Sequence, residues 1–357
     1  MKQTLLYFAY GSNLNSNDLL QSNYGFREGD LHPVKSAYLP DRDLRFTRYS
    51  ETRKGGTLDI VEQKGSAVPG MLFEVKNGDV IAKLDRKEGN GVAYKKIDGS
   101  AILPDGTLVQ CFTYEVIPEQ RKPFVEPTKD YIDIVRSGLR EHNLSGAHLD
   151  RAISNNTPTS QIDSLFVYGT LMRGEKRHSL LAKGQLACIL LSETFGTLID
   201  VGDYPALLLK ETSELKMVQG EFCRFSNVSD AFNDLDAVEG FKGYVSLNNL
   251  FIRTIIHVGM LDGRIRTAWV YVWWSSNVTE PIIKSNDWRE HNKTKDSILR
   301  KILAKHILDS DEADILTRIQ NDWSSPKHND LVSAFTNSLI SERRLAQVTG
   351  KWCVEID

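Results

Sequence analysis

Cysteine is scarce in this sequence of 357 residues, and its spacing is uninformative. The four cysteines stand far apart, at Cys111, Cys188, Cys223 and Cys353. Because no two share the short spacing of a metal or redox motif, we expect free thiols in a reducing compartment. The histidines lack the His-Glu-x-x-His pattern, and no Gly-x-x-x-x-Gly-Lys phosphate loop occurs. The sequence therefore predicts no metal site.

Long apolar runs and a strong net charge are also missing. The run WVYVWW at Trp269–Trp274 is far shorter than the roughly 20 residues that span a bilayer. The apolar stretch Leu5–Tyr10 leads straight into a polar turn, unlike a secretory signal. A net charge of -3 gives no overall attraction to nucleic acid or to an anionic membrane. We expect a soluble cytoplasmic protein that binds neither nucleic acid nor membrane, and whose partner is a small molecule or a protein.

An internal repeat is the most informative feature that the sequence does have. LLYFAYGSNLN at Leu5–Asn15 returns as SLFVYGTLMRG at Ser164–Gly174. Each copy has a short apolar run that favours a buried strand and stops at a glycine, Gly11 or Gly169. A hydroxyl residue follows each glycine and could begin a turn.

A second element follows in both copies. VIAKLDRKEGNGVAYKK in the first copy and AFNDLDAVEGFKGYVSLNN in the second share Leu-Asp-x-x-Glu-Gly. The shared pattern places Glu88 and Glu239 in the same position, and a tyrosine, Tyr94 or Tyr244, follows shortly after. Two elements in the same order and at nearly equal separation indicate a duplicated domain.

The rest of each copy is mostly β with short helices. GGTLDIVEQ and AVPGMLFEV in the first copy, and GTLIDVGDYPALLL and MVQGEFCRF in the second, are typical of strands joined by turns. The stretches that end in Leu-Asp-x-x-Glu favour helices, and Asp105-Gly106 and Asp262-Gly263 favour hairpin turns. We therefore predict an α+β fold of two tandem small mixed β-barrels with flanking helices.

The repeat also sets the expected domain boundaries. We expect a first domain over 1–150, a polar linker over 151–163, a second domain over 164–280 and a helical C-terminal extension over 281–357. Apolar residues recur at helical spacing in this extension. It could pack on the second barrel, or it could form a surface for a protein partner or for self-association.

These residues carry a resemblance to a known family. Tyr-Gly-Ser-Asn after a first strand, with Glu-Gly after a helix, resembles the γ-glutamylcyclotransferase family, and YGTLMRGEKRH resembles its AIG2-like and γ-glutamylamine cyclotransferase branch. The resemblance covers nearly all of residues 1–275. It implies a small β-barrel and release of 5-oxoproline from a γ-glutamyl compound. The segment Glu126–Ser145 resembles the family's helical tail, in which a tyrosine assists substrate binding, and Tyr131 is the candidate.

The implied reaction explains why a buried acid and a glycine turn would lie together. The substrate's own α-amine attacks its γ-carbonyl, so holding one folded conformer supplies much of the rate enhancement. One carboxyl with a pKa raised by burial can take the proton from the amine and later give it to the leaving group, without a cofactor. We assign this catalytic role to Glu88 and Glu239.

The glycine turns are the expected substrate cradles, because a strand-to-helix turn exposes backbone N–H groups to an anion. The residues expected to bind substrate are Tyr10, Gly11, Ser12, Asn13, Leu14, Tyr94, Tyr131, Tyr168, Gly169, Thr170 and Leu171. Arg173 or Arg177 could meet a second carboxylate, although such a basic cluster is more often a solvated face.

A different class of function stays open at this point. One or both barrels could bind γ-glutamyl ligands without turnover, as a sensor or scaffold whose C-terminal helices dock a partner. The sequence does not name the leaving amine or amino acid.

Overall fold

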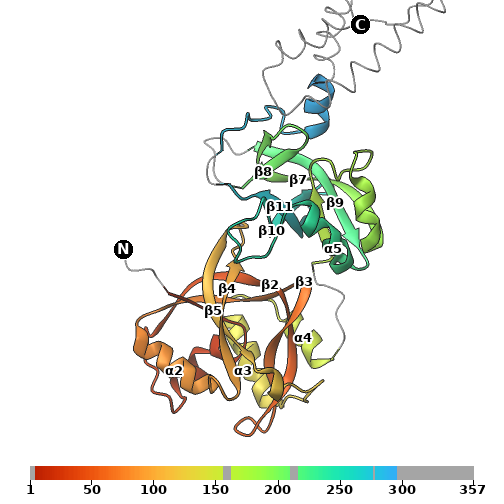
Figure 1. Cartoon of the computed structure of the whole chain (residues 1–357). Coiled ribbons are helices and arrows are strands. Elements are labelled where there is room, and N and C mark those ends of the chain that lie inside the picture. The colour runs from red at the N-terminus through yellow and green to blue at the C-terminus, as the bar shows by residue number, and fades with distance from the viewer. Residues whose placement is uncertain (1–4, 156–161, 210–215, 276–277, 296–357) are drawn as a thin grey trace, which may run out of the picture.

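The computed structural model describes residues 5–155, 162–209, 216–275 and 278–295. Figure 1 shows two barrels in tandem, with the N-terminal one drawn in red to yellow and the other in green to blue. No helix of these residues is long and apolar enough to cross a membrane. Residues 1–4, 156–161, 210–215, 276–277 and 296–357 lie outside the described part.

The first barrel closes through five strands in the order β1-β3-β2-β4-β5. Its strands are β1 (Leu6–Ala9), β2 (Leu31–Ser50), β3 (Gly55–Val75), β4 (Tyr94–Ile102) and β5 (Leu108–Val116). The ring closes where β1 runs parallel to β5, with Tyr7 opposite Phe112. The helices are η1 (Ser12–Leu14), α1 (Ser16–Leu20), α2 (Gly78–Glu88), η2 (Pro118–Gln120), α3 (Lys129–Glu141) and α4 (Ala147–Ile153).

The second barrel repeats this plan. Its elements are β6 (Ser164–Val167), η3 (His178–Gly184), β7 (Leu186–Asp200), β8 (Pro205–Leu208), β9 (Lys216–Phe225), α5 (Val228–Val238), β10 (Phe251–Met260) and β11 (Ile265–Trp273). The order β10-β11-β6-β9-β7 closes because β7 also pairs with β10, and β8 lies beside β7. As in the first barrel, the first strand runs parallel to the last. The prediction of two tandem mixed barrels is confirmed.

The Leu-Asp-x-x-Glu-Gly pattern ends a helix in each barrel. Helix α2 begins after Asn77, whose side chain accepts from the N–H groups of Asp79 and Val80. It ends at Gly89, which has a φ of 60°, and Gly240 after α5 has a φ of 64°. Glycine adopts this left-handed conformation without the steric penalty of other residues. The glycine therefore stops the helix directly after the glutamate.

The core of each barrel includes residues beyond the domain end expected from the sequence. Helix α4 continues past residue 150 to Ile153, and Leu149 and Ala152 are buried in the core of the first barrel. Residues 288–295 are helical, and Ile283 and Trp288 belong to the core of the second barrel. The expected helices over 296–357 lie outside the described residues.

A buried arginine joins the two barrels. The side chain of Arg253 in β10 is 0% exposed, and its Nη2 lies 2.7 Å from Oδ2 of Asp41 in β2. Its Nε lies 3.3 Å from Oδ1 of Asp236 in α5. The guanidinium also lies 4.1 Å from the centre of the Phe232 ring and 5.2 Å from that of Trp269. These contacts attach the β2–β3 hairpin of the first barrel to α5 and β10 of the second.

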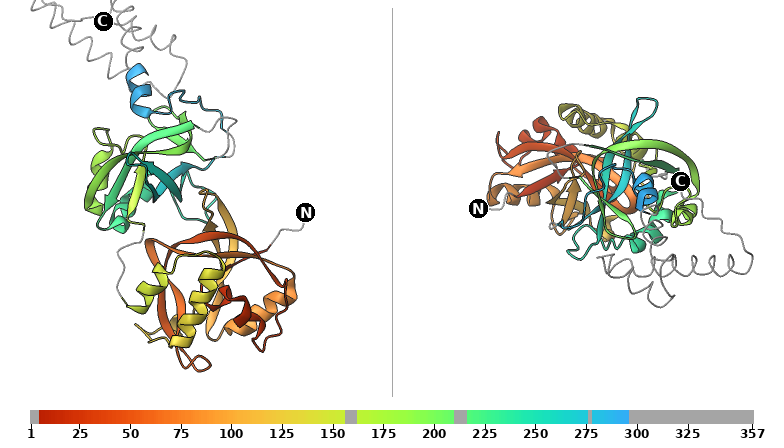
Figure 2. Two further views of the ribbon diagram at one scale, coloured as in Figure 1. Left: turned by 180° about the vertical axis from the view of Figure 1, so that it is seen from behind. Right: turned by 90° about the horizontal axis from the view of Figure 1, so that it is seen from above.

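Further hydrogen bonds surround this arginine. Trp269 Nε1 donates to the carbonyl oxygen of Gly65 (3.1 Å), and Thr254 Oγ1 donates to that of Gly106 (2.6 Å). Lys64 Nζ lies 3.2 Å from Asp236 Oδ2. In Figure 1 strands β4 and β5 of the first barrel rise toward β10 of the second, and β3 rises toward α5. Figure 2 shows the two barrels from behind and from above. The barrels therefore share a buried polar junction.

Replacing Asp41 with Asn tests this junction. Arg253 would keep its charge in a buried position with only Asp236 as a close anionic partner, so we expect the free energy of unfolding to fall by about 3 kcal/mol. Urea denaturation measures it. The control is Lys129→Gln, which removes the exposed Lys129–Asp133 ion pair and should leave the unfolding midpoint unchanged. Equal stability of Asp41→Asn and the wild-type chain would contradict the junction's role.

Candidate functional site

The first pocket opens where the first strand ends. It is lined by Tyr7, Tyr10, Gly11, Ser12, Asn13, Leu58, Glu88, Tyr94, Tyr114 and Tyr131. The glutamate and the glycine turn expected from the sequence thus line one pocket. Leu14 does not line it, against the expectation, because its side chain is 1% exposed and packs in the barrel core.

The glycine turn that lines the pocket has backbone N–H groups without an acceptor among the described residues. The turn is closed by Leu14 N–H, which donates to the Gly11 carbonyl oxygen (3.0 Å), and by Asn15 N–H, which donates to that of Ser12 (3.0 Å). The N–H groups of Gly11, Ser12 and Asn13 donate to no acceptor within the described residues. Consecutive unpaired N–H groups of this kind form an anion-binding concavity.

Glu88 lies against this turn. Asn13 Nδ2 donates to Glu88 Oε1 (2.7 Å) and to the hydroxyl oxygen of Tyr7 (2.8 Å). The Asn13 side chain is buried, and its Oδ1 accepts no hydrogen bond from the described residues. The carboxylate of Glu88 is therefore held at the rim of the cradle.

Three tyrosines place hydroxyl groups around Glu88. Tyr94 donates to the Leu58 carbonyl oxygen (2.9 Å), and the Tyr131 hydroxyl accepts from Leu58 N–H (3.4 Å). Tyr10 donates to the carbonyl oxygen of Tyr114 (2.6 Å). Burial raises the pKa of Tyr131 to about 12 and also raises the pKa values of Tyr10 and Tyr94 well above the ordinary tyrosine value. All three are neutral near pH 7 and can act as hydrogen-bond donors or acceptors, not as bases.

An aspartate fixes the helix that carries Glu88. The Tyr114 hydroxyl in β5 donates to Asp85 Oδ1 in α2 (2.8 Å), and Lys96 Nζ lies 3.3 Å from Asp85 Oδ2. Asp85 and Glu88 are three residues apart, so they lie on neighbouring positions of one helical face. Neither Asp85 nor Tyr114 is among the site residues expected from the sequence. The recurrence of the aspartate in both copies of the motif was the available signal.

The second pocket contains the equivalent turn and glutamate. It is lined by Phe166, Val167, Tyr168, Gly169, Thr170, Leu171, Arg177, Tyr204, Pro205, Glu239, Phe251 and Tyr271. Met172 N–H closes the turn onto the Gly169 carbonyl oxygen (2.9 Å). The N–H groups of Gly169, Thr170 and Leu171 have no acceptor among the residues that the structure describes.

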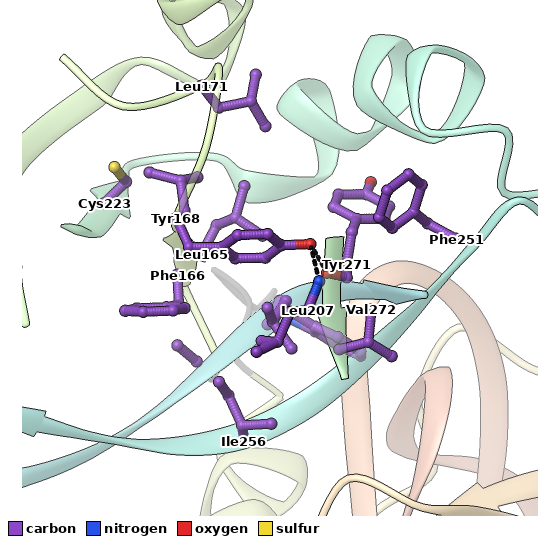
Figure 3. Close-up of a cluster of buried hydrophobic side chains, with 14 of the residues drawn as sticks. Leu165, Phe166, Tyr168, Leu171, Leu207, Cys223, Phe251, Ile256, Tyr271 and Val272 are labelled. Carbon is purple, nitrogen blue, oxygen red and sulfur yellow. Dashed lines mark hydrogen bonds between the residues drawn. The ribbon is translucent and has the colours of Figure 1, made fainter. Parts of the chain in front are cut away.

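The hydrogen bonds that fix the first site recur in the second. The Tyr168 hydroxyl donates to the Tyr271 carbonyl oxygen (2.8 Å) and accepts from Leu207 N–H (3.2 Å), as Figure 3 shows. The Tyr271 hydroxyl donates to Asp236 Oδ1 (2.7 Å). Tyr168, Tyr271 and Asp236 thus repeat Tyr10, Tyr114 and Asp85.

The surroundings of the two glutamates differ. Leu171 stands where the first copy has Asn13, so Glu239 lacks the amide donor that Glu88 has. Burial raises the pKa of Glu239 to about 7, although the positive charge of Arg177 lowers it. A carboxyl with this pKa is close to half protonated at neutral pH, which suits a group that must both accept and donate a proton.

The expectation that Tyr94 and Tyr244 occupy equivalent positions in the two copies is wrong. Tyr94 starts β4 opposite Val116, and the residue in the same position of the second barrel is Phe251, which starts β10 opposite Trp273. Tyr244 lies at the junction between the barrels, where its carbonyl oxygen accepts from Ser100 Oγ (3.1 Å). The spacing from the glutamate is not a guide to equivalent residues here, because the strand pairing decides which residues occupy the same position in the two barrels.

Of the two arginines singled out, Arg177 lines the second pocket and Arg173 does not. Arg173 is exposed, and its backbone N–H donates to Glu221 Oε2 (2.7 Å).

Comparison with known proteins gives concordant matches. The family model "Gamma-glutamyl cyclotransferase, AIG2-like" matches residues 7–133 and 165–290. A gamma-L-glutamyl-butirosin B gamma-glutamyl cyclotransferase of Niallia circulans is 32% identical over 129 residues, which are 36% of this chain and 76% of that protein. The gamma-glutamylcyclotransferase of Bos taurus is 28% identical over 147 residues, 40% of this chain and 73% of that protein. A solved structure named gamma-glutamyl cyclotransferase is 23% identical, with a TM-score of 0.38, and covers 44% of this chain and 92% of that one.

The raised pKa of Glu239 predicts a pH-dependent stability. Between the ordinary carboxyl pKa and about pH 7 the folded chain holds a proton that the unfolded chain has released, so stability falls as pH rises through this range. Glu239→Gln mimics the protonated form. At about pH 8.5 we expect this variant to be more stable than the wild-type chain by about 3 kcal/mol.

Chemical denaturation at two pH values measures this difference. At about pH 4, where both states of the wild-type chain bind the proton, the two chains should be equally stable. A stability difference that does not change between the two pH values would show that Glu239 titrates normally.

Proposed function

The chain belongs to the gamma-glutamyl cyclotransferase, AIG2-like family, whose model matches both barrels, and on that premise we propose that each barrel releases 5-oxoproline from a γ-glutamyl compound. The chain is an enzyme of the γ-glutamylcyclotransferase type. The observation that carries the proposal is the recurrence, in both copies, of a carboxyl group facing a turn with unpaired backbone N–H groups.

The proposed reaction begins with a proton transfer. Glu88 or Glu239, as carboxylate, removes a proton from the substrate's α-ammonium group, which frees the nitrogen lone pair. The nitrogen attacks the γ-carbonyl carbon, a carbon–nitrogen bond forms, and the carbonyl electron pair moves onto oxygen. The N–H groups of the turn, at Gly11 to Asn13 or at Gly169 to Leu171, stabilise this oxyanion.

The second half of the reaction returns the proton. The protonated carboxyl donates it to the departing nitrogen, the original amide bond breaks, and the carbonyl re-forms as part of the five-membered ring. After the attack the ring nitrogen still holds two hydrogens, so the carboxylate takes one of them and passes it to the departing nitrogen as well. The products are 5-oxoproline and an ammonium ion. Both protons that the α-ammonium group loses end on the departing nitrogen, so one carboxyl group serves both transfers.

Tyr131 is proposed to hold the substrate in the first barrel. Its hydroxyl lies at the cradle, since a Cβ atom added to Gly11 would stand 3.7 Å from the hydroxyl oxygen. Helix α3 positions Tyr131, and the Thr128 side chain caps that helix by accepting from Tyr131 N–H. The further tyrosine that lines the second pocket, Tyr204, comes from the turn between β7 and β8 and not from a helix that follows the last strand. The two sites are therefore proposed to share the chemistry and to differ in how they bind substrates.

The proposed substrate class is γ-glutamyl amino acids, γ-glutamyl amines or a γ-glutamyl-tagged metabolite. The relative from Niallia circulans acts, by its name, on gamma-L-glutamyl-butirosin B, which is a metabolite of the third kind.

Three variants test the assignment of the glutamates. For each substrate of a γ-glutamyl panel, Glu88→Gln or Glu239→Gln should lower 5-oxoproline release by about 10²- to 10⁴-fold when the altered barrel is the one that acts on it, because Gln cannot exchange the proton. The double variant should release none.

The control is Asp133→Asn, an exposed position on α3 outside both pockets, which should retain full release. Full activity of the double variant would refute the assignment. No turnover by the wild-type chain across a wide panel would favour a binding module.

Tyr131→Phe tests the proposed binding role. Loss of one neutral hydrogen bond to the bound substrate should raise the KM of the first site about 5- to 10-fold with little change in kcat. Steady-state kinetics in the Glu239→Gln chain isolate the first site. A fall in kcat at unchanged KM would instead place Tyr131 in the chemical step.

A further inference from the structure

The second pocket contains a cation that the first pocket lacks. Arg177 lines it together with Glu239, and its backbone N–H donates to the carbonyl oxygen of Thr170 in the cradle turn (2.8 Å). The guanidinium lies 5.7 Å from the centre of the Tyr204 ring. Backbone and ring together hold the arginine at the side of the cradle.

The charge of Arg177 is not neutralised by a close partner. The side chain is half-buried and forms no ion pair with any carboxylate of the described residues. Glu239 attracts it through space, but Glu239 is partly protonated at neutral pH and must change its charge during the proposed reaction. A half-buried guanidinium with unused N–H donors in a pocket favours an anion with planar oxygens.

The first pocket shows which part of a substrate such an anion would belong to. Both pockets share the cradle, the glutamate and the Tyr–Tyr–Asp hydrogen bonds, so these serve the γ-glutamyl group that both substrates have. In the first copy the chain after Leu14 enters helix α1 through Asn15, and no lysine or arginine lines that pocket. Arg177 thus lines the second pocket and has no counterpart among the lining residues of the first. A feature that the two pockets do not share is suited to the part of the substrate that differs, which is the leaving group.

We propose that Arg177 makes the second site selective for γ-glutamyl compounds whose departing amine carries a carboxylate. The inference rests on the proposed function, since it names the substrate class of the same site. The carboxylate would pair with the guanidinium while the γ-glutamyl group occupies the cradle. A substrate whose departing amine carries no carboxylate would leave the guanidinium of Arg177 unpaired.

The test compares γ-glutamylglycine with γ-glutamylglycinamide, which differ only in the charge of the leaving group. In the Glu88→Gln chain, where the first site is silent, kcat/KM for 5-oxoproline release should favour the carboxylate by about 10- to 100-fold, the range of a charge-assisted hydrogen bond. Adding Arg177→Gln should bring this ratio to about 1–3.

The ratio separates selectivity from the acid–base step. Arg177 also lowers the pKa of Glu239, so its loss changes the proton transfer for both substrates alike, and this effect cancels in the ratio. Arg177→Lys keeps a charge and should retain part of the preference. Arg173→Gln, the exposed neighbour that does not line the pocket, should retain all of it.

An unchanged ratio in Arg177→Gln would overturn the proposal, whether or not the activity on both substrates falls. Failure of the proposed function has a separate signature, because no chain would then release 5-oxoproline from either compound. In that event, calorimetry measures the binding of γ-glutamylglycine and of γ-glutamylglycinamide to the Glu88→Gln/Glu239→Gln chain. A preference for γ-glutamylglycine that Arg177→Gln removes would support the selectivity, and equal affinities would end it.

Discussion

One hydrogen bond in each barrel, from a tyrosine of the last strand to an aspartate of the helix that leads to the glutamate, holds the candidate site together. Tyr114 donates to Asp85, and Tyr271 donates to Asp236. The carbonyl oxygen of the same tyrosine accepts from the tyrosine that precedes the glycine turn. A single strand residue therefore fixes both the helix that carries the glutamate and the turn that faces it. Barrel closure makes this contact available, because the last strand pairs with the first.

The second copy has diverged around this conserved frame. Asp236 also contacts Arg253 and Lys64, so the first barrel supports the helix that ends at Glu239. Its counterpart Asp85 is bonded to Lys96, Tyr114 and Asn90, which all belong to the first barrel. Leu171 replaces Asn13, the amide donor beside the glutamate, and burial raises the pKa of Glu239. The two barrels thus share the same tyrosine–aspartate hydrogen bonds but surround their glutamates with different polar and charged groups.

Repetition made much of the fold and the core of each site predictable. Two motifs in fixed order predicted two barrels and placed both glutamates beside glycine turns. Tyr114 and Tyr271 were missed because an aromatic residue in a strand looks like core until its partner is known. The junction was missed because Asp41 and Arg253 are distant in sequence, and pairing depends on the folded arrangement. Tyr244 was wrongly taken as the equivalent of Tyr94. The two tyrosines follow their glutamates at similar distances in the sequence, but the loops after the glutamates differ in length, and the strand pairing makes Phe251 the equivalent residue.

The central claim is that a γ-glutamyl group binds between the glycine turn and the glutamate in each barrel. The most direct measurement is a crystal structure of the full chain with 5-oxoproline bound. The account predicts the product at both turns, with an oxygen on the N–H groups of Gly11 to Asn13 or of Gly169 to Leu171, and its ring nitrogen within reach of Glu88 or Glu239. Product bound elsewhere, with both turns empty at saturating concentration, would contradict it.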